Sequence, residues 1–451
     1  MKKIISVLSN RHTLSLAGNL TNAVLGFLSI ALVARLLLKD DMGAWFMFMT
    51  GYILADLLRA GIIHTSLIRF AASSDDEKFK EVSGSGWMIS MITTLILTVV
   101  TLGSFFLFGK HISNPGFKLF LEWYWIAAIT TLPFNYAAWL LQSKSQFDKV
   151  LYIRLLNQLS FMTCVLIGLI FNYNKLEYVL FSFVVSGLLP SAISMWAGWS
   201  MIHTMRYATK SKMLELFNFG KFSMGTLMGS NLLRSSDTIL IGFLLTTRDV
   251  AIYAIPLKLI EVIEILLRSF VSTAMPEMSK YSAPEHKLQL REMYYKYTGL
   301  LSIILLPVVI ACFIFADTLV ILLGGAQYAE SANILRVLAV YAAFLPLDRF
   351  SGITLDIIGK PYLNFIKVIL MLVVNVSGDL IAIHFTKSTM GVAAVSILTF
   401  ITGVIFGNYF LKKYLNQSIR TTLIIGIKST IHILEPVTER FKSFKIGTPS
   451  S

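Results

Sequence analysis

Two neighbouring apolar runs decide the fold of this chain: residues 217–275 read FNFGKFSMGTLMGSNLLRSSDTILIGFLLTTRDVAIYAIPLKLIEVIEILLRSFVSTAM, with a short turn at residues 246–249. Each run is long enough to cross a bilayer, which takes about 20 residues. Six ionisable residues nevertheless lie well inside the runs, namely Arg234, Asp237, Lys258, Glu261, Glu264 and Arg268. They recur at steps of three and four, so they share one face of each helix. A charge at the centre of a membrane helix costs roughly 2.5 to 3.5 kcal/mol, so these side chains must face protein or water.

The composition places the whole chain in a membrane. Of its 451 residues, 55% are hydrophobic and only 14% are charged, and the mean hydropathy is +0.71. Apolar runs recur from end to end, which excludes a soluble catalytic domain. The first run continues to Leu38 without a cleavage site, so it is expected to stay as a membrane helix. The two cysteines, Cys164 and Cys312, exclude a disulfide framework or a cysteine metal site.

Twelve apolar runs are long enough to span, so we expect an all-α integral membrane protein. In the first half they cover residues 14–38, 44–70, 87–108, 119–141, 151–171 and 176–199, and in the second half residues 217–245, 250–275, 297–323, 332–358, 362–385 and 390–411. Of the 39 Lys and Arg residues, 26 are expected on the same side of the membrane as the N-terminus, and Lys367 is one of these. Six are expected on the opposite side. Because cytoplasmic loops hold the excess of Lys and Arg, both termini are predicted to be cytoplasmic. The net charge of +14 therefore reflects topology, and no nucleic-acid partner is expected.

Six spans in each half return the chain to its starting side. We therefore predict two six-helix lobes related by a pseudo-two-fold axis along the membrane normal, with a cleft lined by spans one, two, seven and eight. The predicted parts are residues 1–200 for the first lobe, 201–216 for a cytoplasmic linker, 217–411 for the second lobe, and 412–451 for a basic cytoplasmic tail. Within the tail, apolar residues recur at helical spacing from Ile419 to Leu434, which predicts an interfacial amphipathic helix.

Short motifs along nearly the whole chain, up to about Leu411, resemble those of a known family. They include Ala34-Arg35-Leu36-Leu37, Asp41-Met42-Gly43, Ser66-Leu67-Ile68-Arg69, Arg234-Ser235-Ser236-Asp237 and Gly359-Lys360-Pro361. The chain is similar to the polysaccharide transporter family, within the multidrug, oligosaccharidyl-lipid and polysaccharide exporter superfamily. The resemblance implies a flippase, not an enzyme, that moves undecaprenyl-pyrophosphate-linked oligosaccharide across the bacterial cytoplasmic (inner) membrane by alternating access, for surface polysaccharide biosynthesis. It also implies membrane lipids, a polysaccharide polymerase and chain-length machinery as partners.

The substrate of such a flippase is an anion, so the transporter needs cations in a hydrated cleft. The predicted substrate-binding residues are Arg59, Arg234, Lys258, Arg268 and Arg349. Arginine suits this role because its planar fork binds phosphate oxygens bidentately. The candidate ion-coupling residues are Asp56, Asp237, Glu261 and Glu264, with Asp348, Asp356 and Asp379 ranked below them. The coupling ion could be H+ or Na+; no catalytic residue, metal site or other cofactor is expected.

Two other interpretations of these charges stay open. The spacing also allows structural ion pairs on one helix, for example Asp56 with Arg59 and Lys258 with Glu261. Arg35 and Arg336 lie near the outer ends of their spans, where snorkelling explains them. The acidic run at residues 75–77 is expected to be a solvated surface.

Other functions and the mechanics of the helices also remain open. A multidrug or organic-cation antiporter of the same superfamily is the first alternative function, and a membrane glycosyltransferase, polymerase or ligase is the second.

Pro256, Gly225 and Gly229 suggest that spans seven and eight bend when the cleft changes its open side. Packing of helices through small residues would explain the two glycines equally well.

Overall fold

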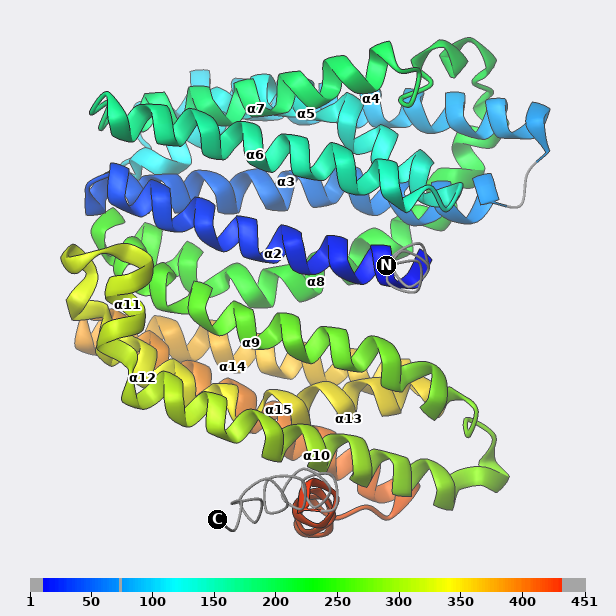
Figure 1. The fold of residues 1–451 in the computed structure, drawn as a ribbon, viewed down its shortest axis with the longest axis vertical. Coiled ribbons are helices and arrows are strands. Elements are labelled where there is room, and N and C mark those ends of the chain that lie inside the picture. Colours follow the sequence, from blue (N-terminus) through cyan, green and yellow to red (C-terminus); the bar gives the residue numbers. More distant parts are fainter. Residues whose placement is uncertain (1–10, 73–74, 432–451) are drawn as a thin grey trace, which may run out of the picture. The chain divides into compact units, whose positions relative to one another are not determined.

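A computed structural model describes residues 11–72 and 75–431, and these residues form helices and no strands. In chain order the elements are α2 (Arg11–Leu36), α3 (Lys39–Ala72), α4 (Asp76–Phe108), α5 (Pro115–Ser143), α6 (Phe147–Ile170), α7 (Leu176–Trp196), η1 (Ile202–Tyr207), α8 (Lys210–Leu244), α9 (Thr247–Ser279), η2 (Pro284–His286), α10 (Lys287–Ile314), α11 (Ala316–Gly324), η3 (Ala326–Ser331), α12 (Ala332–Ala342), α13 (Leu345–Ile357), α14 (Pro361–Thr386) and α15 (Thr389–Leu415) (Figure 1). A last helix covers residues 419–431.

The predicted spans all lie on helices. By length and composition alone, eight helical segments of the described chain are long and apolar enough to cross a membrane. The helices α8 and α9, whose charged faces the sequence singled out, are not among them. The chain is therefore an all-α, multi-pass membrane protein, and its most polar long helices are the two that the sequence marked as functional.

Two of the predicted spans are each divided between two helices. The run 297–323 breaks at Phe315, between α10 and α11, and the run 332–358 breaks at Ala343 and Phe344, between α12 and α13. Pro346 stands in the first turn of α13, where its missing N–H leaves no hydrogen bond unmade. Asp317 in the first turn of α11 favours a new helix start there through the helix dipole.

The chain divides into two compact units. Unit 1 comprises residues 1–255 and 320–330, and unit 2 comprises residues 256–319 and 331–451. The division falls inside the continuous helix α9, between Ile255 and Pro256. The lobe boundaries expected from the sequence stay a prediction.

In unit 1, α3 packs against both α8 and α5. A Cβ placed on Gly220 of α8 would overlap the backbone carbonyl of Ile62 on α3, so the two helix backbones touch. On the other side, a Cβ on Gly51 would lie 2.7 Å from the ring of Phe120 on α5. The small residues let α3 sit close to both neighbours, which places its polar side chains in the interior of the unit.

The predicted linker is a packed part of unit 1. Residues 201–216 contain η1 and the first turns of α8. The indole N–H of Trp87 on α4 donates to the backbone oxygen of Ser200 at 2.6 Å, and Thr204 donates to Ser83 at 3.0 Å. The connection between the two halves of the sequence is therefore held against α4.

The acidic run before α4 caps that helix. The carboxylate of Asp75 accepts a hydrogen bond from the backbone N–H of Lys78 at 3.0 Å. The N–H groups of the first helical turn have no partner within the helix, and this bond supplies one. The bond and the nearby Lys78 ammonium together hold the pKa of the Asp75 carboxyl below its usual range. The run is exposed, as expected, and it also fixes where the helix begins.

In unit 2 the helix at residues 419–431 packs on α10. The backbones of Gly299 and Gly426 lie so close that a Cβ on either would overlap the other. Ile424, Ile427 and Ile431 point away from the contact and are about half exposed. This apolar exposed face agrees with the predicted interfacial helix, which stays a prediction, and its part beyond Ile431 lies outside the described residues.

Candidate functional site

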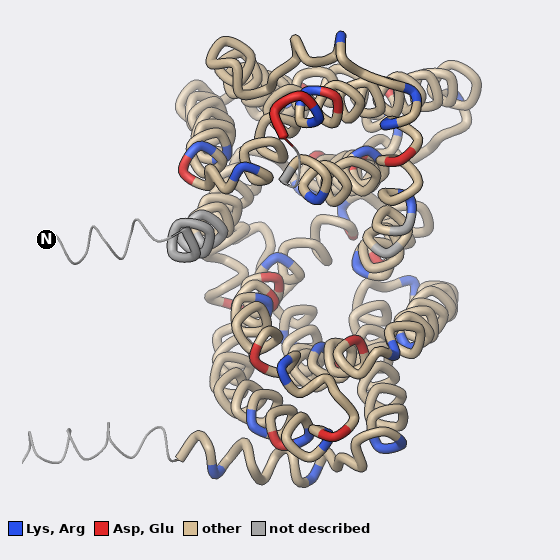
Figure 2. Tube along the Cα trace, turned by 90° about the vertical axis from the view of Figure 1, so that its right-hand side faces the viewer, with Lys and Arg blue, Asp and Glu red and all other residues tan. Residues whose placement is uncertain are grey.

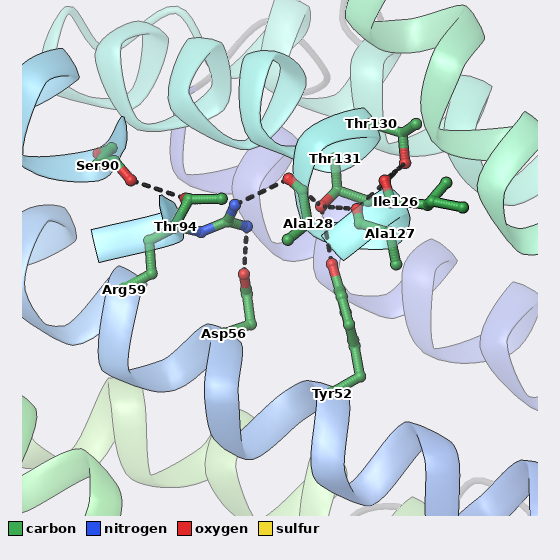
Figure 3. Close-up of polar contacts among 10 residues, drawn as sticks. All are labelled: Tyr52, Asp56, Arg59, Ser90, Thr94, Ile126, Ala127, Ala128, Thr130 and Thr131. Carbon is green, nitrogen blue, oxygen red and sulfur yellow. Dashed lines mark hydrogen bonds and ion pairs between the residues drawn. The ribbon is translucent and has the colours of Figure 1, made fainter. Parts of the chain in front are cut away.

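The most deeply buried charge of unit 1 is the guanidinium of Arg59. Arg59 on α3 has no exposed surface; it forms an ion pair with Asp56 one turn earlier and donates to the backbone oxygen of Ala128 on α5 at 3.1 Å (Figure 3). The side chain of Asp56 is 23% exposed. The pair predicted from the spacing is confirmed, and its acid is accessible whereas its base is not.

Aromatic and hydroxyl side chains surround this pair. The hydroxyl of Tyr52 on α3 lies 2.8 Å from that of Thr131 on α5 (Figure 3). Among the described residues, Arg59 Nε and the hydroxyl of Tyr124 have no hydrogen-bond partner. Asp56 therefore supplies most of the compensation that a buried cation requires. For an anionic headgroup to reach Arg59, α3 and α5 would have to separate.

A second buried acid of unit 1 lies where α8 meets the start of α9. Asp237 is 8% exposed and accepts a hydrogen bond from the hydroxyl of Tyr253, which is itself buried. Arg234, one turn earlier on α8, is half-buried. The sequence marked both charged residues by their spacing but did not single out Tyr253 as the partner that orients the acid.

In unit 2, α9 carries the next charged group. Lys258 Nζ lies 2.7 Å from Glu261, and both side chains are about a quarter exposed, at 27% and 22%. This spaced pair is also confirmed. Further along the helix Glu264 is half-buried and Arg268 is exposed. The charged face of α9 thus becomes more accessible toward its C-terminal half.

Arg349, the last of the predicted substrate-binding residues, lies on α13 of unit 2 and is exposed. Its backbone neighbour Phe350 is fully buried and contacts Phe270 of α9, with ring centroids 6.4 Å apart. Among the predicted substrate-binding residues, the exposed arginines Arg268 and Arg349 therefore belong to helices that touch inside one unit.

An ion pair between helices of unit 2 escaped the sequence analysis. Lys367 on α14, counted by the sequence analysis on the side of the N-terminus, is only 2% exposed, and its ammonium lies 2.8 Å from both the carboxylate and the backbone oxygen of Asp348 on α13. The predicted span at residues 362–385 already contains Lys367, but its spacing gives no sign of a partner on another helix.

The helix α14 also carries a fully buried acid. Asp379 has no exposed surface, and Asn375 one turn earlier is also buried. Ser396 and Thr399 are buried polar residues of the neighbouring helix α15. The sequence analysis ranked Asp379 low because its spacing shows no charged partner on the same helix.

Arg35 and Arg336, assigned to snorkelling, both bind protein groups. Arg336 pairs with Asp317, and Arg35 donates to the backbone oxygens of Leu322 and Leu323. Both arginines therefore have partners on α11, which the sequence analysis did not foresee, and snorkelling stays a prediction. Elsewhere Lys, Arg, Asp and Glu are scattered along a mostly neutral trace (Figure 2), and no three His, Cys, Asp or Glu side chains of residues 11–72 and 75–431 form a metal site.

The fold and these residues define an all-α, multi-pass membrane protein whose long helices carry buried and half-buried charges. The comparisons with known proteins identify its family. A family model described as "Polysaccharide biosynthesis protein" matches residues 32–333, and the chain belongs to this family. It is 20% identical over 202 residues to the probable low-salt glycan biosynthesis flippase Agl15 of Haloferax volcanii. That match covers 45% of this chain and 43% of Agl15.

Solved transporter structures share the fold over nearly the full chain. The lipid II flippase MurJ, in an inward closed conformation, aligns with a TM-score of 0.74 and 14% identity over 97% of this chain and 94% of that one. An inward-facing multidrug resistance MATE family transporter aligns with a TM-score of 0.69 and 17% identity over 89% and 99%. The chain therefore shares the fold of these two solved transporters, and the relatives named here are two flippases and a transporter.

Proposed function

We propose that this protein is a flippase that moves undecaprenyl-pyrophosphate-linked oligosaccharide across the bacterial cytoplasmic membrane for surface polysaccharide biosynthesis. The observation that carries the proposal is the match of residues 32–333 to the polysaccharide biosynthesis family. The similarity to Agl15, a glycan biosynthesis flippase, supports it. The fold shared with MurJ supports a route for lipid-linked substrates by alternating access.

The accessible cations would bind the pyrophosphate. A pyrophosphate loses hydration when it crosses a low-dielectric slab, and guanidinium groups replace that hydration with charge-assisted hydrogen bonds. Arg268 and Arg349 are exposed, and Arg234 and Lys258 are half-buried. Arg59 is enclosed in unit 1, so we assign it to holding Asp56. Among the five predicted cations, Arg268 is therefore the first to test.

Coupling to H+ or Na+ would use a carboxylate whose surroundings change in the cycle. Asp56 and Glu261 each hold a base on the same helix, and Asp237 holds the hydroxyl of Tyr253. Protonation of such an acid weakens its contact and biases one conformation over another. Glu264 and the buried Asp379 are the remaining candidate acids. Each acid is to be neutralised by a single substitution, and transport is then measured under an imposed pH or sodium gradient.

A vesicle assay tests the function directly. Purified protein is reconstituted with fluorescent undecaprenyl-pyrophosphate oligosaccharide, and a membrane-impermeant quencher measures its appearance in the opposite leaflet. We expect translocation above that of protein-free vesicles, and at least a tenfold loss for Arg268→Gln with partial recovery for Arg268→Lys. The matched control is Lys280→Gln, which removes an exposed cation just beyond the end of α9. If Arg268→Gln and Lys280→Gln have the same rate, the role of Arg268 is wrong. If wild-type protein does not translocate the lipid at all, the flippase proposal is wrong.

The alternative is a multidrug or organic-cation antiporter, and the fold shared with the MATE family transporter favours it. An antiporter for cations needs acids that are free to bind its substrate. Asp56 and Glu261 are instead held by bases within one helical turn, which argues against it. Efflux of an organic cation from the same vesicles, without movement of the lipid-linked sugar, would establish the antiporter.

The topology is part of the proposal. Reporter fusions at residues 110, 174 and 387 are expected to lie outside, and fusions at residues 145, 208 and 283 inside, with both termini cytoplasmic. If the fusions show the opposite orientation, the fold is intact but the proposed direction of transport is reversed.

A polysaccharide polymerase and chain-length machinery would receive the flipped substrate. Co-purification from native membranes tests that association.

A further inference from the structure

Residues 320–330, the end of α11 and most of η3, have an unusual place in the chain. They belong to unit 1, although the residues before and after them belong to unit 2. Within unit 1 they contact the end of α2, the start of α3 and the start of α9. We call residues 320–330 the strap. All of its partners lie at the ends of helices on the predicted outer side of the membrane.

The strap and α2 cap each other. Arg35 near the end of α2 donates to the backbone oxygens of Leu322 at 2.6 Å and Leu323 at 3.1 Å, at the end of α11. In return, Gln327 donates to the backbone oxygens of Ala34 at 2.7 Å and Leu37 at 3.1 Å. The last carbonyls of a helix have no partner within it, and cations there also interact favourably with the helix dipole. Each segment thus satisfies orphan carbonyls of the other.

A shared carboxylate completes the connection. Glu330 pairs with Lys39 at the start of α3, and Arg248 at the start of α9 lies 3.1 Å from the same oxygen. The side chain of Glu330 is 45% exposed and that of Arg248 is 53% exposed. Exposed ion pairs of this kind contribute little stability and exchange readily with water.

The contact between α3 and α9 is of a different kind. A Cβ on Gly43 would overlap the backbone carbonyl of Thr247, so the starts of these helices are in direct backbone contact. The strap, in contrast, packs partly on itself, since a Cβ on Gly324 would lie 2.6 Å from the ring of Tyr328. Its contacts with the surrounding helix ends named above are hydrogen bonds and ion pairs, while its own side chains Val320, Leu323 and Tyr328 are fully buried. Release of the strap therefore breaks the polar ties and also exposes apolar side chains, whereas the backbone contact between α3 and α9 can be kept.

We propose that the strap is a releasable closure of the predicted outer side, held by Arg35, Gln327 and Glu330, and that it must detach when the transporter opens outward. The proposal rests on the alternating access inferred above. Detachment breaks the polar ties and exposes Val320, Leu323 and Tyr328, and the ties are the part of the closure that single substitutions can weaken.

Cross-linking tests whether release is needed. Cys164 and Cys312 are replaced by serine, and Lys39→Cys with Glu330→Cys are joined by a short bifunctional methanethiosulfonate. We expect at least a tenfold loss of lipid-linked oligosaccharide translocation, restored by a reductant. The control pair is Lys212→Cys with Glu215→Cys on one helix, α8, where the same link constrains nothing. Full translocation by the cross-linked strap would overturn the proposal.

Accessibility gives a readout that needs no substrate. Ala251 lies in α9 three residues after Arg248, which pairs with the strap, and is fully buried, so Ala251→Cys serves as the reporter. Glu330→Gln is expected to raise its rate of labelling from outside, by a membrane-impermeant thiol reagent, at least fivefold. Asp317→Asn, which removes a charge from α11 outside the strap, is expected to leave the rate unchanged. Equal rates in both variants would overturn the strap, whereas faster labelling without any lipid translocation would overturn only the proposed substrate.

Discussion

Each unit contains an ion pair in which the base is buried and the acid is partly exposed to solvent. In unit 1, Asp56 and Arg59 stand three residues apart on α3. In unit 2, Asp348 and Lys367 stand on different helices, α13 and α14. Besides its acid, Arg59 donates to the backbone oxygen of Ala128, whereas Lys367 donates to both the backbone oxygen of Asp348 and the hydroxyl of Ser351. The two pairs therefore differ in how much each base depends on its acid.

The largest expected effect comes from removing the acid of unit 1. Asp56→Asn leaves the guanidinium of Arg59 buried and uncompensated, and arginine does not lose its proton. We expect a loss of about 3 to 5 kcal/mol in the free energy of unfolding. For Asp348→Asn we expect about 2 kcal/mol, because Lys367 keeps two other acceptors, the backbone oxygen of Asp348 and the hydroxyl of Ser351. Denaturant unfolding in detergent, followed by tryptophan fluorescence, measures both.

The double variant Asp56→Asn/Arg59→Met sharpens this comparison. The second substitution removes the buried charge that Asp56→Asn leaves uncompensated, so most of the lost stability should return. If Asp348→Asn costs as much as Asp56→Asn, or if the double variant is no better than the single one, burial of the base is not what makes the first pair critical.

The two pairs also mark what the sequence could predict. A spacing of three or four residues shows which side chains meet on one helix, so Asp56 with Arg59 and Lys258 with Glu261 were predictable. The membrane class, the helices and the family resemblance followed from apolar runs and short motifs. Contacts between helices carry no such local signal, which is why the partners of Lys367, Asp237 and Arg35 were missed. Their partners lie 19, 16 and 287 residues away in the chain.

A smaller effect separates the glycines of α8. Gly220 touches the backbone of α3, whereas a Cβ on Gly225 or Gly229 would meet no heavy atom within 4 Å. Gly220→Ala must push α3 and α8 apart, so we expect a loss of about 1 to 3 kcal/mol in the free energy of unfolding. Gly225→Ala and Gly229→Ala should raise it by about 0.5 to 1 kcal/mol, because alanine favours the helix.

Transport by the two stabilised variants decides why those glycines are there. If α8 bends during the cycle, Gly225→Ala/Gly229→Ala should be more stable and yet translocate lipid-linked oligosaccharide several times more slowly. A more stable protein with the wild-type rate would show that neither bending nor close approach at these positions is required.

The smallest effect on stability is expected for Lys258 and Glu261. This pair has the same spacing as Asp56 and Arg59, but its base is not buried. Lys258 and Glu261 are both about a quarter exposed, so water solvates either one when the other is removed. Lys258→Met should therefore lower the free energy of unfolding by less than about 1 kcal/mol. If Lys258 binds the pyrophosphate, the same variant should reduce translocation at least tenfold, and Lys258→Arg should recover part of it. The ratio of the two effects distinguishes the roles, because a structural pair loses stability and transport together. Equal translocation by Lys258→Met and wild type would leave this pair, like that of Arg59, as a tie within the helix.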